Sequence, residues 1–197
     1  MAHHKEFLVR LYEALRDLVG WLEATKVPGI IIGAVATALL GRPRITRDVD
    51  AVILLGETTP EDFLDAGRRF GFVPRLPDVL AFAQQSRVLL LRHEPSGVDV
   101  DISLGALPFE QESIARSERR NLADISLPLP TAEDLIIMKA VAHRAIDLHD
   151  VDGLLAANPS ADLERVRHWV GEFSRVLEMP EILDDLERIV KQRLRAR

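Results

Sequence analysis

Two aspartates separated by one residue, Asp48 and Asp50, open the apolar run DVDAVILL. Side chains alternate along a strand, so both carboxylates are expected on one face. Carboxylates are costly to bury without partners, and a divalent cation, Mg²⁺ (or Mn²⁺), would relieve their mutual repulsion because such ions prefer oxygen ligands. The alternative is a strand end at which both acids pair with Arg44 and Arg47 in solvent.

Two further features favour the metal site. Gly33 and Ala34 join a short apolar strand to a helix, and backbone N–H groups at a helix start can hold phosphate oxygens. Downstream, the segment VDVDIS places Asp99 and Asp101 on one face of a strand that could lie beside DVDAVILL. A phosphate-binding turn, paired aspartates and a third acid on a neighbouring strand form the arrangement expected for a site that holds metal ions and a triphosphate.

These motifs resemble the nucleotidyltransferase superfamily, which has the DNA polymerase β-like fold. The segment GAVATALLGRPRITRDVDAVI resembles its phosphate-binding turn and D-x-D strand, and VDISLGALPFE resembles its later acidic strand. The stretch DLIIMKAVAHRAIDLHDVDGLL is similar to a lysine-then-aspartate helical motif of the minimal bacterial nucleotidyltransferases and AbiEii-type toxins. The resemblance covers about residues 29–155 and implies a mixed β-sheet flanked by helices, with a helical C-terminal part.

The resemblance implies roles for individual residues. It implies that Asp48, Asp50 and Asp101 are the catalytic carboxylates that bind the metal, with Asp99 as the alternative third ligand. Ala34 departs from the usual second Gly or Ser of the turn, so a hydroxyl that could contact phosphate is missing. The residues implied for nucleotide binding are Gly33, Ala34, Arg44, Arg47 and Lys139.

Lys139 also permits a purely structural interpretation. If residues 135–150 form one helix, Lys139, His143, Asp147 and Asp150 fall within an arc of about 80°. Under the resemblance Lys139 contacts the triphosphate, supported by Asp147 and Asp150. Alternatively, these residues form a mutually neutralising polar cluster that fixes the packing of helices.

The function implied is Mg²⁺-dependent transfer of a nucleoside monophosphate from a nucleoside triphosphate (NTP) to a hydroxyl of tRNA, a protein or a small molecule. The resemblance to the AbiEii-type toxins further implies that the protein is the toxin of a toxin–antitoxin pair and that a cognate antitoxin is its partner. The alternative is a catalytically inactive nucleotide-binding or regulatory module on the same fold, which Ala34 keeps open.

Composition is ordinary for a globular protein of 197 residues, with 47% hydrophobic and 28% charged residues. The chain has no cysteine, which excludes disulfides and thiolate metal sites and makes the cytoplasm the expected compartment. No apolar run approaches the roughly 20 residues of a membrane span, so no membrane partner is expected. The net charge of −6 argues against nonspecific adhesion to nucleic acid.

The patterning predicts an α/β (α+β) fold with an α/β core over residues 1–130, including an N-terminal helix, and a helical subdomain over residues 131–197. Helices are predicted at residues 5–26, 33–41, 59–71, 108–120, 131–157, 162–177 and 181–195. Extended segments are predicted at residues 29–32, 48–55 and 123–130, and a hairpin at residues 87–103.

Overall fold

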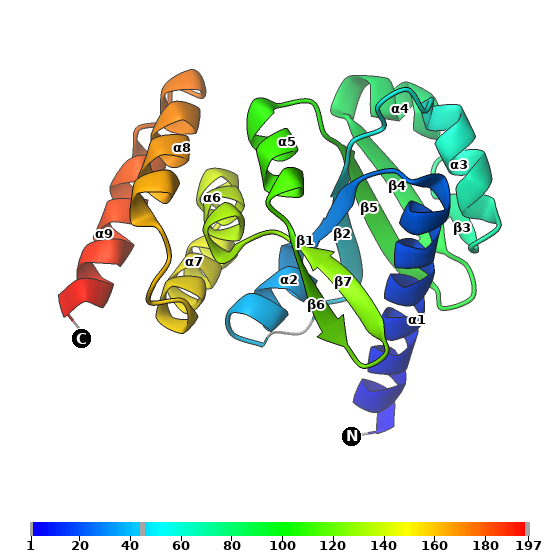
Figure 1. Cartoon of the computed structure of the whole chain (residues 1–197), viewed down its shortest axis with the longest axis horizontal. Coiled ribbons are helices and arrows are strands. Elements are labelled where there is room, and N and C mark those ends of the chain that lie inside the picture. Colours follow the sequence, from blue (N-terminus) through cyan, green and yellow to red (C-terminus); the bar gives the residue numbers. More distant parts are fainter. Residues whose placement is uncertain (1, 44–45, 196–197) are drawn as a thin grey trace. The chain divides into compact units, whose positions relative to one another are not determined.

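The computed structural model describes residues 2–43 and 46–195, with side chains from residue 6 onward (Figure 1). The chain divides into two compact units. The first comprises residues 1–35 and 45–129, and the second comprises residues 36–44 and 130–197. The short segment 36–44, which the sequence division assigns to the α/β core, thus belongs with the helical part.

The first unit is built on a five-stranded mixed sheet with the strand order β1-β2-β5-β4-β3. β2 and β5 are parallel, while the other neighbouring pairs are antiparallel. The predicted hairpin is confirmed as β4 and β5, and the predicted pairing of the two acidic strands is confirmed as β2 beside β5. The strands are β1 (Gly29–Ile32), β2 (Asp48–Ile53), β3 (Phe72–Pro74), β4 (Val88–His93) and β5 (Val98–Leu104).

Helix α1 (Ala2–Thr25) supplies much of the core of this unit. Trp21 is fully buried and stacks on Phe63 and Phe72, with ring centroids 4.1 and 5.1 Å away. The predicted cap of α3 (Pro60–Arg68) is confirmed, because the Thr59 hydroxyl accepts a hydrogen bond from the backbone N–H of Asp62. The side chains of β2 and β5 that face away from the aspartates are buried, and they fix the orientation of both strands: Val49, Ala51, Val100 and Ile102.

Three parts of this unit differ from the sequence predictions. Strand β3 and helix α4 (Val79–Ser86) were not predicted. The predicted helix over residues 108–120 is wrong in its second half, because α5 (Pro108–Ala115) ends early and β6 (Glu118–Leu122) pairs with β7 (Ile125–Leu129). β6 is almost wholly exposed and rich in charge, so it carries no apolar alternation that would indicate a strand.

The second unit contains the later residues of α2 (Gly33–Leu40) and four helices: α6 (Ala132–Ala142), α7 (Ala145–Ala157), α8 (Leu163–Val176) and α9 (Glu181–Arg195). The single helix predicted over residues 131–157 is wrong, because His143 adopts a left-handed conformation with φ of 53°. The backbone N–H of His143 still bonds to the carbonyl of Lys139, and the ring Nε2 lies 3.0 Å from Asp185 Oδ2. Within residues 2–43 and 46–195, the helices are either too short or too polar to cross a lipid bilayer.

Candidate active site

The four aspartates of β2 and β5 lie in two rows on one face of the sheet. The parallel register pairs Asp48 with Asp99 and Asp50 with Asp101. Neighbouring strands are about 4.8 Å apart, so each pair brings two carboxylates side by side. The sequence prediction that both pairs share one face is confirmed by this register.

Gly33 lies directly against one of these carboxylates. It follows β1, whose last residue Ile32 pairs with Asp50, and it begins α2 with a φ of +62°. A Cβ atom at Gly33 would lie 1.9 Å from Asp50 Oδ2 and 2.7 Å from Asp50 Cγ. Only glycine permits both this backbone conformation and this approach, so the start of α2 is held against the acidic face.

Thr46 positions the first aspartate. Its hydroxyl donates a hydrogen bond to Asp48 Oδ1 at 2.7 Å and lies 3.1 Å from the Asp48 carbonyl oxygen. Thr46 is buried, whereas Asp48 is exposed and Asp50 is half-buried. A buried hydroxyl therefore orients a carboxylate that remains accessible to a ligand.

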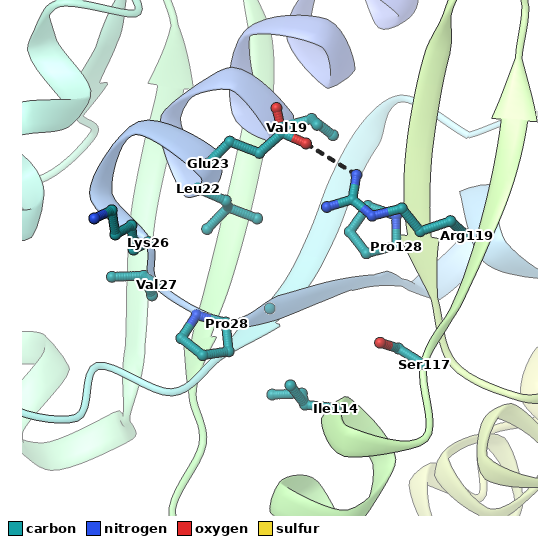
Figure 2. Close-up of a pocket in the computed structure, with 11 residues that line it drawn as sticks. Val19, Leu22, Glu23, Lys26, Val27, Pro28, Ile114, Ser117, Arg119 and Pro128 are labelled. Atoms are coloured by element: carbon teal, nitrogen blue, oxygen red, sulfur yellow. Dashed lines mark hydrogen bonds and ion pairs between the residues drawn. The ribbon is translucent and has the colours of Figure 1, made fainter.

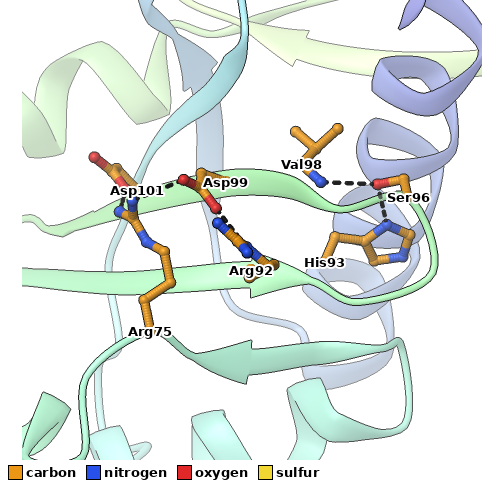
Figure 3. Close-up of polar contacts among 7 residues, drawn as sticks. All are labelled: Arg75, Arg92, His93, Ser96, Val98, Asp99 and Asp101. Atoms are coloured by element: carbon orange, nitrogen blue, oxygen red, sulfur yellow. Dashed lines mark hydrogen bonds and ion pairs between the residues drawn. The ribbon is translucent and has the colours of Figure 1, made fainter.

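Two arginines that were not predicted as site residues contact the aspartates of β5 from the side of that strand away from β2 (Figure 3). Arg92 of β4 donates from Nε to Asp99 Oδ1 at 2.8 Å. Arg75, which follows β3, donates from Nη1 to Asp99 Oδ2 at 3.1 Å and from Nη2 to Asp101 Oδ1. Both oxygens of Asp99 are therefore engaged, while no donor among the described residues reaches Oδ2 of Asp101.

The two carboxylates of β5 differ in acidity because arginines engage both oxygens of Asp99 but only one oxygen of Asp101. The hydrogen bond from Arg92 lowers the pKa of Asp99, and Arg75 adds to this effect. Burial raises the pKa of Asp101, and the nearby carboxylates of Asp48 and Asp99 raise it further against the opposing charge of Arg75. Asp101 thus experiences the repulsion that a bound cation would relieve, which favours it over Asp99 as the third metal ligand.

The residues present fit a divalent cation in donor type, and they lie on one face of the sheet. Asp48, Asp50 and Asp101 offer the hard carboxylate oxygens that Mg²⁺ and Mn²⁺ prefer, on one accessible face. Their side chains do not surround a common point: over residues 2–43 and 46–195 no three His, Cys, Asp or Glu groups are gathered closely enough to enclose an ion. Waters and substrate phosphates usually complete a Mg²⁺ shell, so an open set of carboxylates is compatible with this ion.

Comparison with known proteins adds evidence on the fold. No protein-family model matches the sequence, and no curated protein does. An antigenic nucleotidyltransferase-like protein from Paracoccidioides brasiliensis matches with a TM-score of 0.55 at 16% identity, over 88% of this chain and 90% of that chain. The solution structure of the antibiotic-resistance factor ANT(2'')-Ia matches with a TM-score of 0.58 at 13% identity, over 92% and 97%. The chain has a nucleotidyltransferase-like fold.

The nucleotidyltransferase-like fold confirms the predicted fold class, a mixed sheet flanked by helices with a helical C-terminal part. At such low identities the likeness establishes the fold and leaves the site roles as predictions. The AbiEii-type subgroup also remains a prediction.

The remaining predicted site residues fall in different places. Arg47 is exposed immediately before β2, and Arg44 lies outside the described residues. Ala34 is buried in the first turn of α2, so its methyl group is part of the packing. Of the residues predicted to bind nucleotide, Gly33 at the start of α2 is the one that packs against Asp50.

Lys139 lies in the second unit, in a buried cluster of charges. Its Nζ is 2.9 Å from Asp147 Oδ1 and 3.0 Å from Asp150 Oδ2, and all three side chains are almost inaccessible. A continuous helix would place Lys139 and Asp147 about 12 Å apart along its axis. The turn at His143 brings them together instead, so the chain folds back to form this ion pair.

A hollow of about 290 Å³ lies elsewhere in the first unit (Figure 2). The end of α1, the start of β1, the end of α5 and the hairpin of β6 and β7 form its walls. The ion pair between Glu23 and Arg119, at 2.9 Å, crosses one side of it. It borders Gly29 at the opposite end of β1 from Gly33, and none of the four aspartates lines it, so it is separate from the candidate active site.

Proposed function

We propose that this protein is a Mg²⁺-dependent nucleotidyltransferase that moves a nucleoside monophosphate from an NTP to a hydroxyl acceptor. The observation that carries the proposal is the meeting of three elements: Asp50 on β2, Asp101 opposite it on β5, and Gly33 packed against Asp50 at the start of α2. Carboxylates and helix N–H groups thereby lie next to each other, as a metal–triphosphate substrate requires.

In this proposal Asp48, Asp50 and Asp101 hold the metal ion, Mg²⁺ or Mn²⁺. When bound, the ion neutralises the charge that develops on the phosphates and favours departure of pyrophosphate. The backbone N–H groups of Gly33 and Ala34 bind phosphate oxygens, and the exposed guanidinium of Arg47 adds positive charge.

The reaction forms a bond between the acceptor oxygen and the α-phosphorus and breaks the bond from that phosphorus to the bridging oxygen of pyrophosphate. The proton of the acceptor hydroxyl passes to a carboxylate. Asp101 is the proposed base because its Oδ2 has no donor among the described residues, whereas both oxygens of Asp99 bind arginines. Thr46 keeps Asp48 oriented throughout.

Lys139 has a structural role in this proposal. Its charge is balanced by Asp147 and Asp150, and extraction of Lys139 toward a phosphate would remove a buried cation that contacts two buried carboxylates. The pair Asp147 and Asp150 therefore supports the turn between α6 and α7.

The acceptor is proposed to be a hydroxyl of tRNA, a protein or a small molecule, and the biological setting is a toxin–antitoxin pair with a cognate antitoxin. These finer statements rest on the motif resemblance, and the resistance factor among the structural neighbours supports testing antibiotics as acceptors. The competing candidate is a catalytically inactive nucleotide-binding module, which is favoured by Ala34 in place of a residue with a hydroxyl.

The deciding experiment incubates the protein with each α-³²P-labelled NTP and Mg²⁺ or Mn²⁺. Total tRNA, a protein lysate and antibiotics that carry hydroxyl groups are offered as acceptors. Label transfer is expected with at least one of them, and Asp50→Asn is expected to abolish it. Asp65→Asn, which changes an exposed acid on α3, is the matched control and should retain transfer. NTP binding without transfer to any acceptor would favour the inactive module.

A further inference from the structure

Arg75 is the side chain that connects the acidic face to the outer strands of the sheet. Its backbone N–H donates to the carbonyl of Leu90, and Leu90 pairs with Asp101, which in turn pairs with Asp50. Arg75, just after β3, therefore stands in one row with Leu90, Asp101 and Asp50 of β4, β5 and β2. The side chain of Arg75 crosses β4 to reach Asp101 on β5 (Figure 3).

The contacts of Arg75 engage only part of its guanidinium. Nη1 binds Asp99 and Nη2 binds Asp101, but Nε is buried and has no hydrogen-bond partner among residues 2–43 and 46–195. A buried donor without an acceptor is costly, so this arrangement is maintained by the attraction of the two carboxylates. Arg75 is thus the positive charge that balances Asp101.

Arg92 offers a contrast on the neighbouring row. Its Nε binds Asp99 Oδ1, and its side chain is half exposed. Asp99 keeps this partner whether or not Arg75 stays in place. Asp101 has no second cationic partner among the described residues, so the charge balance of Asp101 depends on Arg75 alone.

We propose that Arg75 is a positioning residue that competes with the divalent cation for Asp101 and thereby sets the cation affinity of the site. The inference rests on the proposed function, because it takes Asp101 as a metal ligand. The guanidinium holds Oδ1 of Asp101, and a cation bound to either oxygen of this carboxylate would adjoin it, so two positive charges would repel each other across one carboxylate. Binding of the cation therefore displaces the Nη2 contact, while Asp99 retains Arg92.

The test uses Mn²⁺ alone, titrated into the full chain at pH 7.5, with free Mn²⁺ measured by electron paramagnetic resonance. Arg75→Gln is expected to bind Mn²⁺ about tenfold more tightly than the natural chain, because the competing charge-assisted hydrogen bond is removed. Arg75→Lys retains the competing charge and should remain within about threefold of the natural chain. Arg92→Gln, which leaves Asp101 untouched, should change the affinity by less than about threefold.

An affinity of Arg75→Gln equal to or below that of the natural chain would overturn the inference. A second readout does not require any variant to fold: the Nε–H resonance of Arg75 in the ¹⁵N,¹³C-labelled natural chain, assigned through its own side-chain carbons. Addition of Mg²⁺ should shift this resonance and leave that of Arg92 nearly unchanged, whereas an unmoved Arg75 resonance at saturating Mg²⁺ would contradict the displacement.

The outcomes separate this inference from the proposed function. If the natural chain transfers label with Mg²⁺ but Arg75→Gln shows unaltered Mn²⁺ affinity, the role of Arg75 is refuted and the enzyme assignment stands. If the natural chain binds no Mn²⁺, alone or with NTP, and transfers no label, both are refuted.

Discussion

The contact between Gly33 and Asp50 makes Gly33→Ala the sharpest test of the candidate site. Alanine at φ of +62° costs about 1–2 kcal/mol in the backbone alone. Its Cβ would lie 1.9 Å from Asp50 Oδ2, so the carboxylate has to retreat by about 1.5 Å to reach an ordinary contact. Forcing Asp50 off its rotamer adds about 0.5–1.5 kcal/mol. With further movement of the backbone, the clash is expected to cost about 2 kcal/mol in addition to the strain of the positive φ.

Gly56→Ala is the matched control, because Gly56 has nearly the same φ, +60°, and nothing lies within 4 Å of the position that its methyl group would occupy. Urea unfolding of both variants isolates the clash from the backbone strain. Gly33→Ala should lose about 2 kcal/mol more stability than Gly56→Ala, which corresponds to about 4–8 °C in Tm. In an Asp50→Ala background this excess should shrink, because the carboxylate that obstructs the methyl group is gone.

The same variant tests the chemistry. Displacement of a reacting group by 1 Å can cost about a hundredfold in rate, so label transfer by Gly33→Ala should fall by at least about that factor. Gly56→Ala should transfer label at nearly the natural rate. If Gly33→Ala were as stable as Gly56→Ala and equally active, the inferred packing of the α2 start against Asp50 would be wrong.

Three further outcomes follow from the packing and the buried charges. Gly67→Ala places a Cβ 2.5 Å from the Trp21 ring and should destabilise the first unit by about 1–3 kcal/mol, measured by urea unfolding in a Trp169→Phe background so that Trp21 alone gives the fluorescence signal. Asp147→Asn removes one partner of buried Lys139 and should cost about 3 kcal/mol, seen as a lower unfolding midpoint by circular dichroism; an unchanged midpoint would show that the cluster contributes nothing. Burial alone would raise the pKa of Asp147, but hydrogen bonds from Arg144 and Lys139 lower it overall, so its charged form stabilises the native state above about pH 4 and this contribution is lost as the pH falls further. The stability of Asp147→Asn should therefore fall less between pH 4 and pH 2 than that of the natural chain, and parallel pH profiles would contradict this assignment.

The sequence predicted the acidic face because its signal is local. Alternation along DVDAVILL and VDVDIS assigns the aspartates to one face without any knowledge of the neighbouring strands. Arg75 and Arg92 could not be found in this way, since their contacts with Asp99 depend on the strand order. Arg75 in particular follows β3, a strand of only three residues that has too few positions to show periodicity.

The turn at His143 escaped prediction for a different reason. The segment AVAHRAIDL contains neither glycine nor proline, the residues that ordinarily mark a helix end. The break is stabilised by tertiary partners, because it allows Lys139 to reach Asp147 and His143 to reach Asp185. The turn is indicated only by which charged residues become buried together, and this can be recognised only once the reversal of the chain is known.

The site also explains how β2 and β5 keep their register. A slip of one residue would turn the aspartates toward the core and expose the buried side chains of Val49 and Val100, so burial forbids it. A slip of two residues preserves both faces, and burial alone does not exclude it. It would remove the pairing of Asp50 with Asp101, which aligns the Arg75 contact with the start of α2. The observed register is the one that places the Arg75 contact, Asp101, Asp50 and the start of α2 in a single row.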